Sequence, residues 1–313
     1  MAYKQQFAPA GLDVEGLRKF VQDQMLAIQR AGTESEDNIN TSLTALDGRL
    51  DVLEARGYRE VLQAARTYYV RTDGNDANTG LVDSAGGAFL TVQKAVDVVA
   101  SLDMSIYQVT IQVRSGTYTG GIGLRKTIGS LVPAIVGDTT TPSNVVFSNN
   151  NDIFSIFGSG NNWRISGVKV TTTAGGSAFR ASTYGSLIIE KIDFGTCSGM
   201  HMFAEYGGNI TVGFNLFSYS ITGGANVHMF ARFGGVILNL QQTVTLTGTP
   251  AFSDFASITT LTLIRADGCS FSGAATGRRY SSDGNSVIYV AGAGATYFPG
   301  NVAGVTSNQG LYI

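Results

Sequence analysis

Charged side chains are scarce in this 313-residue chain. Asp, Glu, Lys and Arg together make up 14% of it, well below the usual quarter. The formal net charge is −2, so no basic excess favours nucleic acid as the main partner. Proline is also rare (5), whereas glycine is frequent (40) and hydrophobic residues reach 43%. This composition can fill a core, which excludes general disorder, and it is typical of all-β and fibrous assemblies.

Long apolar runs are absent as well. The N-terminal stretch "MAYKQQFAPAGLDVEG" has none that suits a signal peptide, and no window approaches a membrane span. The two cysteines, Cys197 and Cys269, fit no metal or redox spacing, so we expect unpaired thiols in a chain made in a reducing cytoplasm. If the protein acts outside a cell, release by lysis, as for a virus particle, would explain both absences.

The N-terminal region has helical periodicity. Apolar residues recur at helical spacing over residues 11–30, and Thr33 followed by Glu36 has the form of a capping box that starts a second helix. In that helix, apolar positions recur at intervals of 4, 3, 4 and 3: Ile39, Leu43, Leu46, Leu50 and Leu53. This heptad seam is too short to be stable alone. It predicts a coiled-coil neck that joins several chains, and the alternative is a helix that packs on its own chain.

Strand patterns begin at Thr67. "TYYVRTDGNDANTG" predicts a strand that ends in a turn, and "YQVTIQVRSGTYTG" predicts an alternating strand with a turn. Between them, residues 89–102 ("FLTVQKAVDVVASL") have the one-sided apolar pattern of an amphipathic helix. From residue 106 to 275 the chain consists of short strand patterns separated by Gly, Ser, Asn and Thr.

An internal repeat organises this strand region. "HMFAEYGG" starts at His201 and "HMFARFGG" starts at His228. Aligning the neighbouring segments on them gives a first aromatic column of Phe154, Phe179, Phe203, Phe230 and Phe252. The second column is Phe157, Tyr184, Tyr206, Phe233 and Phe255. The spacing of 22 to 27 residues predicts a solenoid of about seven β-coils, each about 4.8 Å from the next. The 89–102 helix is then well placed to cap its N-terminal end.

The two histidines are the only ones in the chain. The repeat predicts that they occupy the same position in successive coils, which we favour over a metal pair or a catalytic pair because two ligands alone make a poor metal site. The same alignment places Glu205, Arg232 and Asp254 in one column of alternating charge. The alignment leaves open which aromatic column faces the interior.

At this point the sequence resembles a known group. "YYVRTDGNDANTG", "AFLTVQKAVDVV" and "VTIQVRSGTYTGGIGL" resemble the start of right-handed parallel β-helices of the pectate-lyase-like type, and "TGRRYSSDGNSVIYVAGAGATYFPG" resembles the end of many phage proteins. More narrowly, residues 67–313 are similar to β-helical tail fibre and tail spike proteins of bacteriophages and prophages. The resemblance implies a homotrimer of side-by-side shafts that is attached to the particle through its N-terminus.

Some spikes of this architecture cleave host polysaccharide with paired carboxylates. The acids after residue 150 are Asp152, Glu190, Asp193, Glu205, Asp254, Asp267 and Asp283. Glu190 and Asp193 form the best local pair, but a spacing of three puts them on opposite faces of a strand unless a turn intervenes. No acid cluster supports lyase chemistry. The segment Asp73–Asn78 departs from the calcium-loop pattern, and we interpret it as a turn rich in bonds from side chains to the backbone.

We therefore expect an all-β, trimeric, right-handed parallel β-helix with a helical neck. The expected divisions are 1–58 for virion attachment and oligomerisation, 59–105 for a connector and N-cap, 106–275 for the β-helix, and 276–313 for a trimerisation or tip segment. The expected function is a structural phage tail fibre or spike that recognises the host surface, in the virion, without a catalytic residue, metal or cofactor. Expected partners are the chain itself, a baseplate, tail, neck or capsid protein, and optionally a host glycan. The alternatives are a polysaccharide depolymerase on the same scaffold and a non-viral β-helix enzyme.

Overall fold

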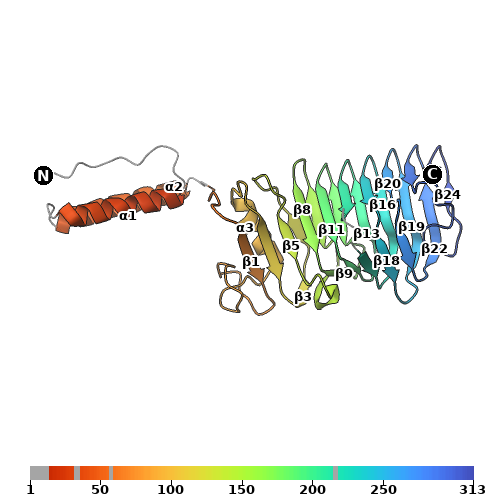
Figure 1. The fold of residues 1–313 in the computed structure, drawn as a ribbon, viewed down its shortest axis with the longest axis horizontal. Coiled ribbons are helices and arrows are strands. Elements are labelled where there is room, and N and C mark those ends of the chain that lie inside the picture. Colours follow the sequence, from red (N-terminus) through yellow and green to blue (C-terminus); the bar gives the residue numbers. More distant parts are fainter. Residues whose placement is uncertain (1–13, 32–35, 56–58, 214–217) are drawn as a thin grey trace.

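The computed structural model describes residues 14–31, 36–55, 59–213 and 218–313, which form a helical pair followed by a long β-solenoid (Figure 1). Helices α1 (Val14–Ala31) and α2 (Glu36–Ala55) confirm the two predicted helices, while Thr33 of the predicted cap lies outside the described residues. Within the expected seam, Leu43 and Leu46 line a hollow between α2 and α1 together with Val21 and Met25. The side chains of Ile39, Leu50 and Leu53 lie outside the described part of the chain. The middle of the seam thus packs on its own chain, and the multi-chain neck stays a prediction.

Three sheets of parallel strands build the solenoid. The ten-stranded sheet contains β1 (Arg66–Val70), β2 (Val109–Val113), β5 (Ala134–Val136), β8 (Asn162–Ser166), β11 (Ser186–Glu190), β14 (Asn209–Val212), β17 (Val236–Asn239), β20 (Leu263–Arg265), β23 (Val287–Tyr289) and β25 (Leu311–Tyr312). The eight-stranded sheet contains β4 (Ile122–Leu124), β7 (Phe154–Phe157), β10 (Phe179–Ser182), β13 (Met200–Glu205), β16 (Ala225–Arg232), β19 (Ala251–Thr259), β22 (Thr276–Ser282) and β24 (Val305–Thr306). The seven-stranded sheet contains β3 (Gly116–Thr119), β6 (Val145–Asn149), β9 (Lys169–Thr172), β12 (Asp193–Phe194), β15 (Ser218–Ile221), β18 (Thr243–Leu246) and β21 (Ser270–Ser272). A single 3₁₀ turn, η1 (Pro142–Asn144), precedes β6 among the described elements.

The strand order confirms a parallel β-solenoid. Each sheet runs through every third strand of the chain, as the order β2-β5-β8-β11-β14-β17-β20 shows for the ten-stranded sheet. Every coil therefore contributes one strand to each sheet, and these seven strands match the predicted number of coils between residues 106 and 275. The sheets also continue beyond that range, because β1 joins the ten-stranded sheet at one end and β22 to β25 extend two sheets at the other.

The predicted amphipathic helix is α3 (Val92–Ser101), which buries Val92, Ala95, Val96 and Val99 in the same core as the first coils. Thr91 caps it by accepting a hydrogen bond from the Lys94 amide. Its role as an end cap stays a prediction.

The loop before α3 confirms a turn with many bonds to the backbone. The Asp76 carboxylate accepts bonds from the amides of Leu90 and Thr91 at 2.9 Å. The Asn78 side-chain amide donates to the carbonyls of Ala85 and Ala88. The side chains of Asp76 and Asn78 therefore hold the backbone that leads into the N-terminus of α3.

The predicted first aromatic column is wrong after its second member. Phe154 and Phe179 stack in the core with ring centroids 5.4 Å apart, but Phe179 pairs with Met202 and not with Phe203. His201 and Met202 are adjacent, and both are buried in the interior, which shifts the register by one residue. Phe203 and Phe230 pair with each other, on strand positions that alternate with the core residues.

The last members of both predicted columns are also misplaced. Phe252 pairs with Ala225 and not with Phe230, and Phe255 lies in the core, where its ring centroid is 4.7 Å from that of His228. The coil that ends in β19 has a longer strand than its predecessors, because β19 spans nine residues. Aligning that coil on the aromatic residues alone therefore placed it five positions out of register, since Phe230 pairs with Ser257.

Candidate functional site

The two histidines lie at equivalent positions of β13 and β16, as predicted, since the flanking pairs are Met200 with Val227 and Met202 with Met229. Both imidazoles are fully buried, and their Nδ1 atoms are 2.9 Å apart. Burial lowers the pKa of His201 to about 4 and lowers the pKa of His228 well below its ordinary value. Both rings are therefore neutral at neutral pH.

Their hydrogen bonds run in one direction. The His201 Nε2 atom lies 2.9 Å from the Gly195 carbonyl, which can only accept, so the proton of this neutral ring is on Nε2 and its Nδ1 accepts. The His228 ring must then donate from Nδ1, which leaves its Nε2 to accept from the Tyr219 hydroxyl at 3.1 Å. Tyr219 in turn accepts from the Asn239 amide. The two equivalent histidines therefore hold opposite tautomers in one linear series of hydrogen bonds, which runs from the Asn239 amide to the Gly195 carbonyl.

This hydrogen-bond network is closed to solvent, since His201, His228 and Asn239 are all fully buried and Tyr219 nearly so. A catalytic group must reach its substrate, so we interpret the network as a structural one that links neighbouring coils. Among the described residues, no group of three or more His, Cys, Asp or Glu side chains could hold a metal ion.

A charged cluster lies beside the histidines on the eight-stranded sheet. The Glu205 carboxylate is completely buried and accepts hydrogen bonds from Arg180 Nε at 3.0 Å and from Arg232 Nη2 at 2.8 Å. Burial acts to lower the pKa of Arg180, but its bonds to Glu205 and Asp152 outweigh that effect and raise it. The two guanidinium groups also flank the Phe203 ring, with their central carbons 5.3 and 5.1 Å from its centroid.

The predicted charge column is correct for its first pair only. Glu205 pairs with Arg232, but the next residue in register is Thr259, while Asp254 pairs with Val227 on one side and Arg278 on the other. The base that completes the cluster is Arg180, which alignment of the aromatic residues had left out of the column.

An aromatic stripe follows the edge where the eight-stranded sheet turns into the ten-stranded sheet. We use this name for Phe157, Tyr184, Tyr206 and Phe233, which are 50%, 68%, 51% and 42% exposed. The last three sit in the left-handed backbone region, with φ of 64°, 49° and 50°. The rings of Tyr206 and Phe233 stack with centroids 5.1 Å apart. The second predicted column thus faces outward, apart from Phe255. Its first step is wrong in register, because Phe157 pairs with Ser182 and not with Tyr184.

Glycine is required where the stripe meets the next coil. Gly207 has a φ of +73°, and a Cβ atom there would lie 2.5 Å from Cε1 of Tyr184. The Tyr184 ring therefore lies over the Gly207 backbone. At Gly234 a Cβ atom would meet no side chain, and there the φ of +75° favours glycine instead.

The best local pair of carboxylates is divided between two sheets. Glu190 ends β11 and Asp193 begins β12, so the turn at Lys191 separates them. Asp193 is nearly buried, 3.1 Å from the Lys169 ammonium, and accepts from the Thr222 hydroxyl. The pair therefore does not face one common groove.

The other acids after residue 150 also have partners. Salt bridges join Asp152 and Glu205 to Arg180, Asp254 to Arg278, Asp267 to Arg265 and Glu190 to Arg164. Asp283 accepts bonds from Ser307 and Asn308, which lower its pKa. The donors around Asp283 favour its ionised form, whereas a general acid must hold its proton.

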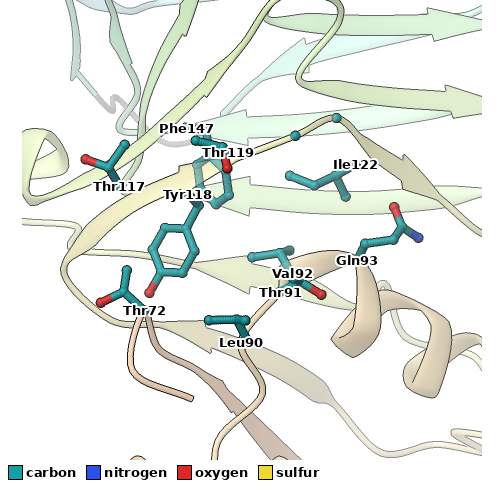
Figure 2. A pocket seen from close by; sticks show the side chains of 12 residues that line it. Thr72, Leu90, Thr91, Val92, Gln93, Thr117, Tyr118, Thr119, Ile122 and Phe147 are labelled. Carbon is teal, nitrogen blue, oxygen red and sulfur yellow. The ribbon is translucent and has the colours of Figure 1, made fainter. Parts of the chain in front are cut away.

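A hollow of about 330 Å³ lies between the N-terminus of α3 and strands β3 and β4 (Figure 2). Its floor is buried and apolar, and its rim is exposed and carries hydroxyl groups. The floor consists of Val92, Tyr118, Ile122 and Phe147, and the rim includes Thr72, Thr91, Thr117 and Thr119. None of the lining residues is charged. The Gln93 amide is already bonded to Asp97 and Gly123, and the Thr91 hydroxyl is bonded to Asp76 and to the Lys94 amide. The polar groups left for a ligand are therefore the hydroxyls of Thr72, Thr117 and Thr119 and the backbone.

Within the described ranges, no helix is both long enough and apolar enough to cross a membrane. A scan against protein-family models finds no match, and no curated protein or solved structure matches the chain. Sequence reasoning missed Tyr219, which bonds to His228, and Asn239, which bonds to Tyr219. It also missed Arg180 of the cluster and the hollow. Only the alternation of strand positions could have pointed to Arg180, because it lies one residue after the core phenylalanine of its coil.

Proposed function

We propose that the chain is a structural protein of a bacteriophage particle, a tail fibre, tail spike or other attached fibre that contributes to recognition of the host surface. The observation that carries the proposal is the solenoid itself, in which three parallel sheets extend through consecutive coils of the described residues. Such a body is a rigid rod with a continuous core, which suits a part that spans distance. The resemblance of residues 67–313 to phage β-helices supports the same function.

The assembled form that we propose is a homotrimer of right-handed β-helices in the virion. Residues 1–58 would join a baseplate, tail, neck or capsid protein, helped by the seam of α2, and residues 276–313 would add trimer contacts or form the tip. Sedimentation equilibrium of the purified chain at micromolar concentration should give the mass of three chains. A monomer at that concentration would refute the trimer.

Particle attachment can be tested directly. Gold-labelled antibodies against the chain should mark particles released by cells that encode it, viewed by negative-stain electron microscopy. A chain that lacks residues 1–58 should leave those particles unlabelled. Unmarked particles from cells that express the full chain would contradict a virion role.

For host contact, we propose that the hollow of Figure 2 holds one uncharged sugar ring. An apolar floor with a hydroxyl rim suits the two faces of a neutral sugar, and its volume is within the range of small-ligand sites. Thr119→Trp should fill the hollow and abolish binding to a glycan array, while Thr245→Trp, on an exposed face of β18, should not. Equal binding by both variants would exclude the hollow.

We prefer a structural fibre over a depolymerase because Glu190 and Asp193 are in different sheets and ion-paired. Incubation with host capsule or lipopolysaccharide should therefore release no reducing sugar. Release that is lost in Glu190→Gln would favour the depolymerase instead.

A further inference from the structure

We propose that the aromatic stripe is the surface through which copies of this chain meet, stripe against stripe, with their solenoids parallel. The inference rests on the self-association in the proposed function and adds where the contact lies. The stripe continues beyond Phe233 to Leu261, which is 69% exposed in the corresponding turn between β19 and β20. Five consecutive coils thus present a large exposed apolar side chain along one edge, and contiguous apolar surface of this kind marks an interaction site.

The ring geometry disfavours a sugar as the occupant. Sugars bind aromatic residues through the ring faces, but the Phe233 ring stacks on Tyr206 and has the Arg232 guanidinium 5.3 Å from its centroid. The Arg180 guanidinium lies 5.7 Å from the centroid of the Phe157 ring. Tyr184 lies over the backbone of Gly207. The stripe therefore offers ring edges, which pack against other apolar side chains.

The period of the stripe favours a second copy over another protein. Exposed apolar side chains recur once per coil, about 4.8 Å apart along the solenoid. Tyr206 and Phe233 hold equivalent positions, whereas Phe157 is in register with Ser182 and therefore lies before the turn. A partner surface with the same rise per coil and the same strand direction can contact each exposed side chain of the stripe. The stripe of a second, parallel copy has this rise and this direction. Contacts between equivalent residues arise where copies share a symmetry axis.

The charges beside the stripe allow this approach. Arg180 and Arg232 are balanced by Glu205 and Asp152, to which they are bonded, so the cluster sums to zero. Copies that meet along this edge therefore bring together apolar rings without gathering like charge. The Tyr184 and Tyr206 hydroxyls remain available to bond at the rim of the contact.

Disulfide trapping of the full chain tests the proposal. In Tyr206→Cys, equivalent sulfurs from two copies should meet, so mild oxidation should convert up to two of every three chains of a trimer into linked dimers. Thr245→Cys is the matched control, since it is exposed on the seven-stranded sheet and should give at least tenfold less product. Cys197 and Cys269 are buried and common to both variants.

Two further measurements complete the test. In the native assembly, a bulky maleimide should label the new thiol of Tyr206→Cys at least tenfold more slowly than the new thiol of Thr245→Cys. The double change Tyr206→Ser and Phe233→Ser should weaken self-association at least tenfold in sedimentation equilibrium, with an unchanged β-sheet circular dichroism signal.

The outcomes separate this inference from the proposed function. A monomeric parent chain would overturn both. A stable oligomer in which the thiol introduced at position 206 neither cross-links nor is shielded from the maleimide would overturn the stripe contact alone and leave that edge to a different occupant.

Discussion

Acid should weaken this protein as the pH falls below 6.5, because two histidines are neutral in its core. The folded pKa of His201 is about 4 and the folded pKa of His228 is well below 6.5, the value expected in the unfolded chain. Below pH 6.5 the unfolded state therefore binds protons that the folded state excludes. Stability is complete above that pH, and it falls as the pH drops toward 4.

The magnitude follows from the unfolded value. At pH 5 an unfolded histidine is protonated about 30-fold over its neutral form, which favours unfolding by about 2 kcal/mol for His201, whose folded pKa is about 4. His228 acts in the same direction, so the free energy of unfolding should fall by at least about 2 kcal/mol between pH 8 and pH 5, a large part of the roughly 5–15 kcal/mol typical of a folded domain.

The carboxylates act in a different range. Neighbouring arginines or hydrogen-bond donors lower the pKa values of Asp73, Asp83, Asp138 and Asp283 below 3.8. Their contribution to stability is therefore lost below that pH, and the window from pH 5 to pH 7 isolates the histidines.

Guanidinium unfolding followed by circular dichroism, at fixed protein concentration from pH 5 to pH 8, measures the effect. The matched control is His201→Phe with His228→Phe, because Phe255 occupies the equivalent position in the next coil. It should be less stable at pH 8, since Tyr219 and Gly195 lose partners, but nearly independent of pH. A parent chain whose stability is flat over this range, or a double variant as pH-dependent as the parent, would refute the reasoning.

Three further outcomes are expected. Arg232→Glu should lower the free energy of unfolding by about 2 kcal/mol in guanidinium titrations, because it sets a second acid beside buried Glu205. The control Arg265→Glu, in an exposed pair, should change it by less than about 1 kcal/mol. Equal losses in the two variants would contradict the buried cluster. Burial raises the pKa of Cys197 to about 11, so the thiol should resist Ellman's reagent at pH 8 until the chain unfolds, and rapid colour in the native protein would be inconsistent with its burial. A chain without residues 1–58 should keep the melting temperature of the solenoid within a few degrees, as read by circular dichroism, and a large loss would show that the helices support the fold.

The solenoid could be predicted because its signals are local and repeated. Alternating apolar residues, glycine-rich turns and a spacing near 25 residues each indicate coils, and equivalent residues such as His201 and His228 identify the register where two copies are nearly identical. The face of α3 was predictable for the same reason, since it follows one periodicity over ten residues.

The register elsewhere depended on backbone irregularities that leave no clear pattern. Two adjacent inward residues at His201 and Met202 shift the alignment of Phe203, and the longer β19 moves Asp254 out of the charge column. Partners from other strands were also beyond reach. Tyr219 reaches His228, and Asn239 reaches Tyr219, only because three sheets surround one interior, which a one-dimensional pattern does not represent.

The parallel ladder also means that the length of the solenoid increases in equal steps, one coil at a time. His201 and His228 are equivalent residues 27 positions apart, so the chain returns to the same place on the ladder after one segment of 27 residues. A chain that carried this segment twice would present the same edges to its neighbours above and below, and would be longer by about 4.8 Å. Shaft length in such a protein can therefore change in whole coils, by duplication or loss of single segments, while the two ends keep their structures and whatever they bind.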